Sequence, residues 1–277
     1  MIEKMLYRIS DGIAWNEVKN MTTVRELYQY LEEKCPRSLS CAWDNDGMMC
    51  SGNTDAEVKH VLCALDMTKR VAEEAEELGC DCIVTHHPMI FSKLSHIDDS
   101  DAQGRLIIQL LKSGISVMSF HTRLDAAEGG VNDTLCKKLG LIPEGAFGEN
   151  GEALGRIART QMPMSSAAFC AQIKSALRTP VLHAVFANRE VSRIAVLGGD
   201  GKDDWRAALA AGADTYVTGT MSYNTLLDAK AAGLNVIAAG HYFTEKPVME
   251  TVASWIGNRF PSVKVSVSET PCEVLSV

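Results

Sequence analysis

The sequence lacks the features of a membrane or secreted protein. No run of about 18 consecutive apolar residues occurs among its 277 residues, so a transmembrane helix is not predicted. The N-terminal segment carries Glu3, Arg8, Asp11 and Glu17, where a signal peptide needs an uncharged apolar stretch. We therefore expect a soluble, cytoplasmic protein without a membrane partner.

Paired cysteines and excess positive charge are also missing. Nine cysteines are scattered between Cys35 and Cys272, and none forms a CxxC pair, which argues against a disulfide framework or a cysteine zinc knuckle. We expect reduced cysteines within the core. The formal charge is -8, from 27 basic and 35 acidic residues, and this charge would repel a phosphate backbone. Nucleic acid is therefore not expected as a partner.

What the sequence does contain is an alternation of short β-rich runs and helical patterns. A helix is predicted at 22–34, capped by Thr22 or Thr23, with Glu26 completing a capping box. Strands are predicted at 61–66, 80–85 and 115–120, each followed by a helical pattern. This order predicts an α/β fold with largely parallel strands.

A Pro- and Gly-rich segment divides the chain. Residues 141–152 (LIPEGAFGENGE) contain one Pro and three Gly in twelve residues, which is typical of a linker. Beyond it, the alternation of strand and helix resumes. We predict an N-terminal extension at 1–21, a first α/β domain at 22–142, and a second at 143–277 whose C-terminal segment could pack back on the first.

The two halves of the chain resemble each other. A gap-free alignment places Gly79 over Gly212, and the same alignment places Val84 over Val217. Chance convergence is an alternative, because Gly before a strand is common. The shared order of strands, and a His at matching strand ends, favour duplication. The sequence thus predicts two similar α/β domains related by internal duplication, with a site in the cleft between their strand ends.

Six potential metal ligands follow the predicted strand ends. They are His86, His87, His121, Asp125, His241 and Glu245. Because ligands of α/β sheets bind at these ends, we expect the six side chains to converge. Imidazole and carboxylate without thiolate suit Zn²⁺, Mn²⁺, Fe²⁺ or Co²⁺. Adjacent histidines can each bind a different ion, and a carboxylate can bridge two, so the pattern predicts a dinuclear centre with two divalent ions per chain.

Each of these residues also has an ordinary interpretation when taken alone. His121 or His241 could be a capping or core histidine. Asp125 could begin a turn, and Glu245 could face a helix dipole. Three stretches that carry His or carboxylate residues occur together at matched strand ends, and this combination favours a metal site. The remaining histidines keep the ordinary interpretation; they are His60, His96 and His183.

The same stretches carry a family resemblance. WDNDG (43–47), VTHHPMIF (84–91), SFHTRLDAAEGGVND (119–133) and AAGHYFTEKPVME (238–250) resemble motifs of the Nif-three-like family, whose members are often named GTP cyclohydrolase 1 type 2 homologues. The match runs from about Thr22 to the C-terminus. The resemblance implies two similar α/β domains, a two-metal site between them and a toroidal homohexamer.

The resemblance also implies roles for particular residues. The family's metal-binding positions match His86, His87, Asp125, His241 and Glu245. His121 matches a position close to the metals. The chain departs from the family at Asp46, where an apolar residue is common, and at Thr220 and Asn224, where the family has an acidic residue and a histidine.

These features predict a metal-dependent hydrolase of a small-molecule substrate, such as a nucleotide, a phosphoester or a cyclic amide. Two ions about 3.5–4 Å apart can lower the pKa of a bridging water and clamp a phosphate or a polarised carbon. His121 would be the catalytic side chain that orients a ligand or shuttles a proton. Ring opening of GTP is a weaker prediction than hydrolysis of a phosphoester or an amide, because no motif in the sequence indicates recognition of guanine. The alternative is a non-catalytic metal-binding scaffold or interaction protein.

Overall fold

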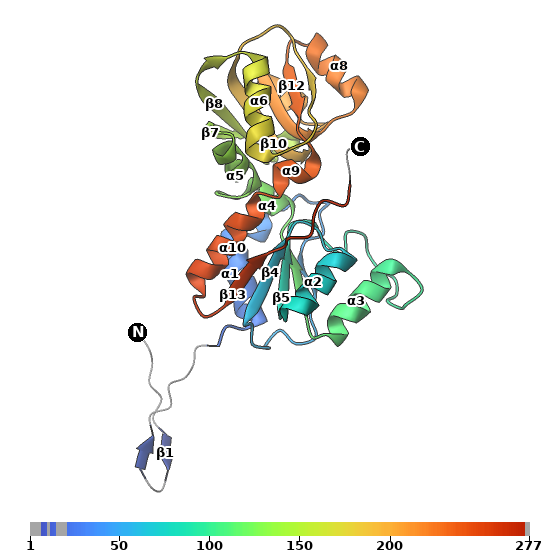
Figure 1. Cartoon of the computed structure of the whole chain (residues 1–277), viewed down its shortest axis with the longest axis vertical. Coiled ribbons are helices and arrows are strands. Elements are labelled where there is room, and N and C mark those ends of the chain that lie inside the picture. Colours follow the sequence, from blue (N-terminus) through green and yellow to red (C-terminus); the bar gives the residue numbers. More distant parts are fainter. Residues whose placement is uncertain (1–6, 10–11, 15–20, 275–277) are drawn as a thin grey trace.

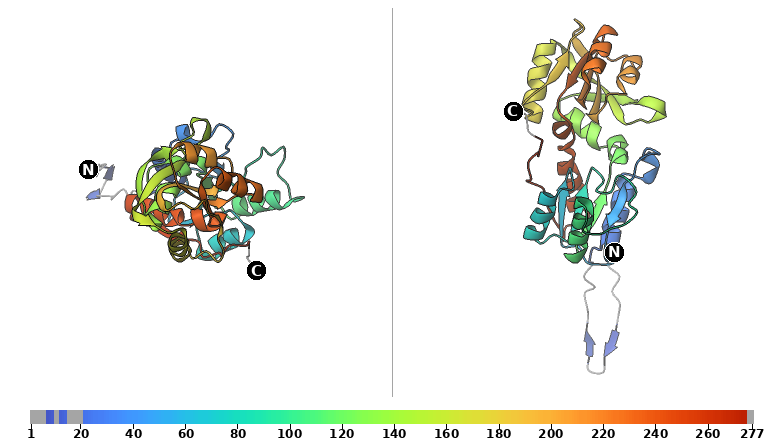
Figure 2. Two further views of the ribbon diagram at one scale, coloured as in Figure 1. Left: turned by 90° about the horizontal axis from the view of Figure 1, so that it is seen from above. Right: turned by 90° about the vertical axis from the view of Figure 1, so that its right-hand side faces the viewer.

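The computed structural model describes residues 7–9, 12–14 and 21–274. Most of the predicted N-terminal extension lies outside these residues; within it, Tyr7–Ile9 (β1) pairs antiparallel with Gly12–Ala14 (β2). In the rest of the described chain, two mixed sheets lie at opposite ends of an elongated molecule, with helices between them (Figures 1 and 2). The predicted α/β class is confirmed.

The first sheet has the strand order β13-β4-β5-β6-β3. The bounds are Lys264–Val267 (β13), His60–Ala64 (β4), Cys82–Thr85 (β5), Ser116–Ser119 (β6) and Gly47–Cys50 (β3). Four of these strands are parallel, and β3 is antiparallel to β6. The last strand of the chain therefore pairs with β4, a strand of the N-terminal half.

Helices cover both faces of this sheet. They are α1 (Val24–Lys34) and α10 (Val248–Arg259) on one face, and α2 (Lys69–Leu78) and α3 (Ala102–Lys112) on the other. Alternate residues of β4 pack against the two helix layers, because successive side chains of a strand point to opposite faces of the sheet. Val61 and Cys63 pack with α1 and α10, whereas Leu62 and Ala64 pack with α2 and α3. Burial on both faces explains why this strand is apolar from Val61 to Ala64.

The start of α1 shows the predicted capping box. Thr23 Oγ1 accepts a hydrogen bond of 3.2 Å from the backbone N–H of Glu26, and Glu26 Oε2 accepts one of 2.9 Å from the N–H of Thr23. Two N–H groups that have no partner within the helix are thereby satisfied. The prediction of this cap is confirmed.

The second sheet has the strand order β7-β8-β10-β11-β12-β9. The bounds are Ile142–Phe147 (β7), Gly155–Met164 (β8), Val191–Asp200 (β10), Thr215–Thr220 (β11), Asn235–Ala238 (β12) and His183–Val185 (β9). Only β10, β11 and β12 pair in parallel, and the other three strands join antiparallel. The prediction of largely parallel strands is wrong for this sheet, because antiparallel strands extend both of its edges, β7 and β8 on one side and β9 on the other.

The segment predicted as a linker is also part of this sheet. Residues 142–147 form the edge strand β7 instead of an open connection. The register shifts between Pro143 and Gly145, so the residues that break a regular strand lie at a bulge. Pro is tolerated on an edge strand because one side of that strand needs no ladder hydrogen bond. Composition alone therefore misidentified this segment.

Helices cover both faces of the second sheet as well. They are α5 (Val131–Lys138) and α6 (Ser166–Leu177) on one face, and α7 (Trp205–Ala210) and α8 (Tyr223–Ala231) on the other. Val196 and Val217 pack with α5 and α6, and the adjacent Ala195 and Tyr216 pack with α7 and α8. Both sheets are thus the middle layer of a helix-sheet-helix sandwich.

Two five-residue helices follow strand ends and lie between the sheets. They are α4 (Thr122–Ala126), after β6, and α9 (His241–Glu245), after β12 (Figure 1). Two 3-10 turns complete the described elements, at Arg37–Leu39 and Glu149–Gly151. Within the described residues, no helix has the length and apolar character to cross a membrane.

Candidate metal centre

The first sheet delivers four of the predicted residues to one edge. β5 ends at Thr85, and His86 and His87 follow it directly. The neighbouring parallel strand β6 leads into α4, where His121 is the N-cap residue and Asp125 lies within the helix. Parallel strands end at the same edge, so these four side chains are brought together although they come from separate segments.

The second sheet supplies the other two predicted residues from α9. His241 and Glu245 are one helical turn apart, and His241 Nε2 lies 3.1 Å from Glu245 Oε2. The strand β10 passes behind this carboxylate at Gly199, where an added Cβ would lie 2.1 Å from Glu245 Oε1. A glycine here leaves the space that the carboxylate occupies.

The carboxylate of Glu245 lies between two groups of potential ligand atoms. Oε1 is 3.7 Å from Nε2 of His86, which is itself 3.8 Å from Oδ1 of Asp125. Oε2 is 3.1 Å from Nε2 of His87 and also faces His241, and the Nε2 atoms of these two histidines are 3.3 Å apart. In each group the ligand atoms lie within 4.8 Å of one another. The two groups share Glu245, which has one oxygen on each side.

Three buried atoms of these groups have no hydrogen-bond partner among the described residues. They are His86 Nε2, Asp125 Oδ1 and Glu245 Oε2. Glu245 Oε2 belongs to this set because the nearby imidazole nitrogens approach it without hydrogen-bond geometry. Leaving such an atom unsatisfied costs about 1–3 kcal/mol. A divalent cation would satisfy nitrogen and oxygen lone pairs together, so the donor set fits a metal site.

The orientation of the imidazoles also suits metal binding. Nδ1 of His86 donates a hydrogen bond of 3.0 Å to the carbonyl oxygen of Phe120. Nδ1 of His87 donates one of 2.7 Å to Oδ1 of Asp66. In both rings the Nδ1 hydrogen is committed to an acceptor outside the site, and Nε2 faces Glu245. Metal-binding histidines are commonly oriented by such a partner.

The two buried carboxyl groups differ in their ionisation. Burial and the negative charge of Glu245 raise the pKa of Asp125 well above its usual range. Burial also opposes ionisation of Glu245, but the three imidazoles around it outweigh this effect and hold its pKa well below the usual range. Without a cation the pair therefore carries a single negative charge. A divalent cation favours the ionised form of both groups.

The two adjacent histidines differ in the same way. Burial lowers the pKa of His86, which is consequently neutral near pH 7. Burial acts against the charged form of His87 too, but the carboxylates of Asp66 and Glu245 raise its pKa to about 10. A cation at Nε2 of His87 would take the place of a proton, so metal binding at this position releases one.

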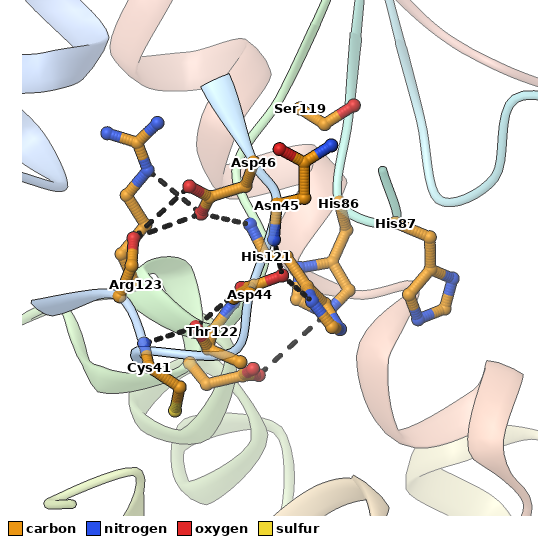
Figure 3. A network of polar contacts seen from close by, with 12 residues as sticks. Cys41, Asp44, Asn45, Asp46, His86, His87, Ser119, His121, Thr122 and Arg123 are labelled. Atoms are coloured by element: carbon orange, nitrogen blue, oxygen red, sulfur yellow. Dashed lines mark hydrogen bonds and ion pairs between the residues drawn. The ribbon is translucent and has the colours of Figure 1, made fainter. Parts of the chain in front are cut away.

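His121 lies beside the two groups and is oriented by Asp44. Its Nδ1 donates a hydrogen bond of 2.9 Å to Asp44 Oδ1, and Asp44 Oδ2 accepts from the backbone and the hydroxyl of Thr122 at 3.0 and 2.6 Å (Figure 3). Burial opposes ionisation of Asp44, but these hydrogen bonds lower its pKa to about 2. The ring centroid of His121 is 5.2 Å from that of His86, and one ring nitrogen of His121 lies within 4.8 Å of a ring nitrogen of His86 and of His87.

A buried ion pair supports the loop that carries Asp44. Nε of Arg123, whose side chain is fully buried, donates a hydrogen bond of 3.0 Å to Asp46 Oδ2. The same carboxylate oxygen accepts one of 3.2 Å from the backbone N–H of His121 (Figure 3). Arg37 also forms an ion pair with Asp46, and Glu32 forms one with Arg123. Asp46, one of the departures from the family pattern, therefore fixes the start of α4.

Exposed aromatic side chains border the site on the side of His121. Trp43 is 59% exposed and Phe91 is 53% exposed, and their ring centroids are 6.3 Å apart. Both rings lie edge-on to His121, at 6.2 and 6.4 Å. The Asn45 side chain donates to the carbonyl oxygen of Ile90, which links the two loops that carry these rings.

Sequence reasoning missed two residues that orient the histidines, Asp44 and Asp66. Asp44 lies in the WDNDG motif, and Asp66 ends the predicted strand at 61–66. For Asp66, its position at a predicted strand end was an available signal, and for Asp44 its place in the WDNDG motif was. The other three histidines lie apart from the cluster: His60 has both ring nitrogens hydrogen-bonded, to Leu78 O and Ser266 Oγ, in the first sheet. His96 is exposed, and His183 lies on β9.

Comparison with known proteins gives consistent matches over most of the chain. The sequence profile of the Duf34/NIF3 (NGG1p interacting factor 3) family matches residues 22–273. A protein of Clostridium perfringens named GTP cyclohydrolase 1 type 2 homolog is 34% identical over 244 residues, which cover 86% of this chain and 93% of that protein. The NGG1-interacting factor 3 of Saccharomyces cerevisiae is 30% identical over 261 residues, which cover 85% and 90%.

Solved structures share the fold. The crystal structure of a hypothetical protein of Staphylococcus aureus aligns with a TM-score of 0.83 at 28% identity, covering 93% of this chain and 100% of that one. A Bacillus cereus protein related to NIF3 also aligns with a TM-score of 0.83, at 24% identity, covering 93% and 99%. At such low identity the second likeness concerns the fold alone.

Proposed function

Because the chain belongs to the Duf34/NIF3 (NGG1p interacting factor 3) family, as its motifs predicted, and carries a candidate His/Asp/Glu metal site, we propose that it is a dinuclear metal-dependent hydrolase. The proposed substrates are a nucleotide, a phosphoester or a cyclic amide. One observation carries this proposal: Glu245 presents one carboxylate oxygen to each of two ligand groups. A carboxylate placed in this way could serve two ions at once, which favours a two-metal site.

The proposed ligands divide into two sets. His86, Asp125 and Oε1 of Glu245 would hold one ion. His87, His241 and Oε2 of Glu245 would hold the other. Divalent ions bound there would supply Lewis acidity and a lowered pKa for water at the site. The residues leave the metal identity open among Zn²⁺, Mn²⁺, Fe²⁺ and Co²⁺.

We assign proton transfer to His121. Its Nδ1 hydrogen is held by Asp44, so Nε2 can accept a proton from water and return it to a leaving group. Asp44 acts through His121: it holds the ring in one orientation and stabilises its charged form, as the carboxylate does in other Asp–His pairs. Asp66 accepts a hydrogen bond from Nδ1 of His87 in the same way and so orients Nε2 of His87 for metal binding.

The proposed site would lie between two duplicated units. The parallel strands β4, β5 and β6 of one sheet correspond in order to β10, β11 and β12 of the other. Val84 and Val217, which the sequence alignment pairs, both lie on the middle strand of their set. We propose that the chain arose by duplication of this α/β unit, and that the subunits form a homohexamer.

A non-catalytic role is the second candidate. The yeast relative is named for an interaction with another protein, which favours a metal-binding scaffold or interaction protein. Turnover distinguishes the two candidates. We would screen nucleotides, phosphodiesters and cyclic amides with added Mn²⁺, Zn²⁺ or Fe²⁺, and compare wild type with Asp125→Asn and Glu245→Gln. Asp228→Asn, an exposed change on α8, is the matched control.

The hydrolase proposal requires turnover that both ligand variants lose and the control keeps. Metal-loaded wild type that matches both ligand variants on every substrate would contradict catalysis and favour the scaffold.

A further inference from the structure

A large cavity adjoins the candidate metal centre on the side of His87 and His241. Its volume is about 950 Å³, within the range of ligand pockets. The first sheet contributes residues after β4, and the second contributes residues after β11 and β12. The proposed reacting centre therefore forms one wall of a space large enough for a whole small molecule.

The C-terminal segment closes another wall of this cavity. All residues from 267 to 274 except Glu269 line it, and the segment after β13 rises from the first sheet toward the second (Figure 1). The carboxylate of Glu74 holds this segment: it accepts hydrogen bonds from the hydroxyl of Ser268, the N–H of Glu269 and the hydroxyl of Thr270, at 2.5, 2.8 and 2.9 Å. The wall is thus anchored on α2.

The cavity is lined mainly by flexible apolar side chains. Leu65, Met67, Val71, Met89, Val181 and Met221 come from both sheets. Methionine adapts its shape to irregular apolar ligands, because its unbranched side chain has several rotatable bonds. Such a lining favours a ligand whose body is apolar, since burial of apolar surface supplies the binding free energy.

One lysine faces this apolar space without an acidic partner among the described residues. The imidazoles of His87 and His241, which also line it, are paired with carboxylates: His87 with Asp66 and Glu245, and His241 with Glu245. Among the described lining residues, Lys246 is the single Lys or Arg, whereas Asp66 and Glu273 are acidic. Lys246 Nζ lies 5.1 Å from the ring centroid of Tyr242, and it forms no ion pair with a described residue. One ammonium group balances one carboxylate. In the metal-free protein, a nucleoside triphosphate, with several negative charges, would need more cations than this wall provides.

We propose that the cavity binds a mainly apolar organic molecule that carries one carboxylate, with the carboxylate at Lys246 and the apolar body against the methionines. The proposed hydrolase function adds that the reacting bond of this molecule lies at the end formed by His87 and His241. Binding itself does not need the metal, so the two claims can be tested separately.

Octanoate is a suitable probe, and 1-octanol is its uncharged counterpart. Their affinities would be measured by calorimetry with the full chain, as purified and after chelation of metal. Val181→Glu adds a charge to the cavity wall at a side chain that is 43% exposed, so folding is little affected. Met221→Glu adds a charge at a half-buried side chain of the same wall. Lys246→Gln removes the cation.

Matched controls lie outside the cavity. Met162→Glu changes a side chain that is 74% exposed on β8, and Lys230→Gln changes an exposed lysine on α8. We expect octanoate to bind the chelated wild type, and each cavity variant to weaken it roughly tenfold or more, because a buried like charge or a lost partner costs that much. The affinity for 1-octanol should not change in Lys246→Gln, and both control variants should bind octanoate with the affinity of wild type.

Octanoate affinities that are equal in wild type and all cavity variants would overturn the proposal. So would binding that disappears on chelation, since the carboxylate would then be held by metal, or GTP binding to the chelated protein more tightly than octanoate does. None of these outcomes depends on turnover, whereas failure of the proposed function would appear as absent turnover with octanoate binding intact.

Discussion

Nδ1 of His121 donates a hydrogen bond to Oδ1 of Asp44 at 2.9 Å, although 77 residues separate them in the sequence. This pair leaves Nε2 of His121 facing two groups of potential metal ligands. Asp44 is in turn fixed by Thr122, and the neighbouring Asp46 is fixed by Arg123. The orientation of the proposed proton-transfer group is therefore determined by buried polar contacts.

Replacing Asp44 by Asn tests the role of this pair. The amide keeps the shape but removes the negative charge that holds the imidazole and stabilises its charged form. We expect kcat to fall by roughly a hundredfold or more, with metal content and KM unchanged. Steady-state kinetics together with metal analysis checks this. Loss of metal in parallel with activity would instead make Asp44 a residue that only supports the metal site.

Asp44 should also make stability depend on pH. Its pKa is lowered to about 2 from an ordinary value of 3.8, so its contribution is present above about pH 4 and is lost as the pH falls toward 2. The shift corresponds to about 2–3 kcal/mol. Urea unfolding of metal-free protein should show wild type more stable than Asp44→Asn at pH 6. That difference should shrink at pH 3, and a difference that does not change with pH would contradict this assignment.

Gly199 is expected to be essential for metal binding. An alanine Cβ at this position would lie 2.1 Å from Oε1 of Glu245, and the backbone has φ +70. Gly233 has a similar φ of +88 but open space around it, so Gly233→Ala is the matched control for backbone strain. Both variants should lose about 1–2 kcal/mol of stability. Only Gly199→Ala should weaken metal binding, by roughly ten- to a hundredfold in a chelator competition; equal affinities would show that Glu245 is not a ligand.

Arg123 should be far more important for stability than an exposed arginine. Arg123→Met removes the buried partner of the Asp46 carboxylate and leaves it only the half-exposed Arg37, and breaking a buried pair costs about 3–5 kcal/mol. Solvent screens the exposed Arg25–Asp55 pair, which should contribute little to stability, so Arg25→Met is the control. Chemical unfolding measures both. Similar losses in the two variants would contradict a structural role for the Arg123–Asp46 pair.

Much of the site could be predicted because strand ends are visible in the sequence. His86 and His87 follow an apolar run directly, and His241 and Glu245 have helical spacing, so their convergence needed only the rule that parallel strands end at one edge. The capping box at Thr23 could also be predicted, because its two partners are only three residues apart in the sequence. The predicted domain bounds stay a prediction.

Other features could not be predicted because their partners are distant in sequence or depend on pairing. Asp44 reaches His121 only after β3 pairs with β6. Residues 141–152 have the composition of a linker, and only pairing with β8 makes part of that segment an edge strand. The burial of Arg123 depends on contacts from α1 that the HTRLD motif does not reveal. Sequence patterns report local structure, whereas these features depend on tertiary contacts.

The most direct test of the proposed centre is the number of metal ions per chain. Metal analysis of metal-replete protein, combined with anomalous scattering from crystals, would give the number and place of the ions. We expect about two ions per chain in wild type, on either side of Glu245, and about one in Asp125→Asn, which loses an anionic ligand of only one set. A single ion or none in wild type, with the side chains around Glu245 ordered, would contradict the dinuclear centre.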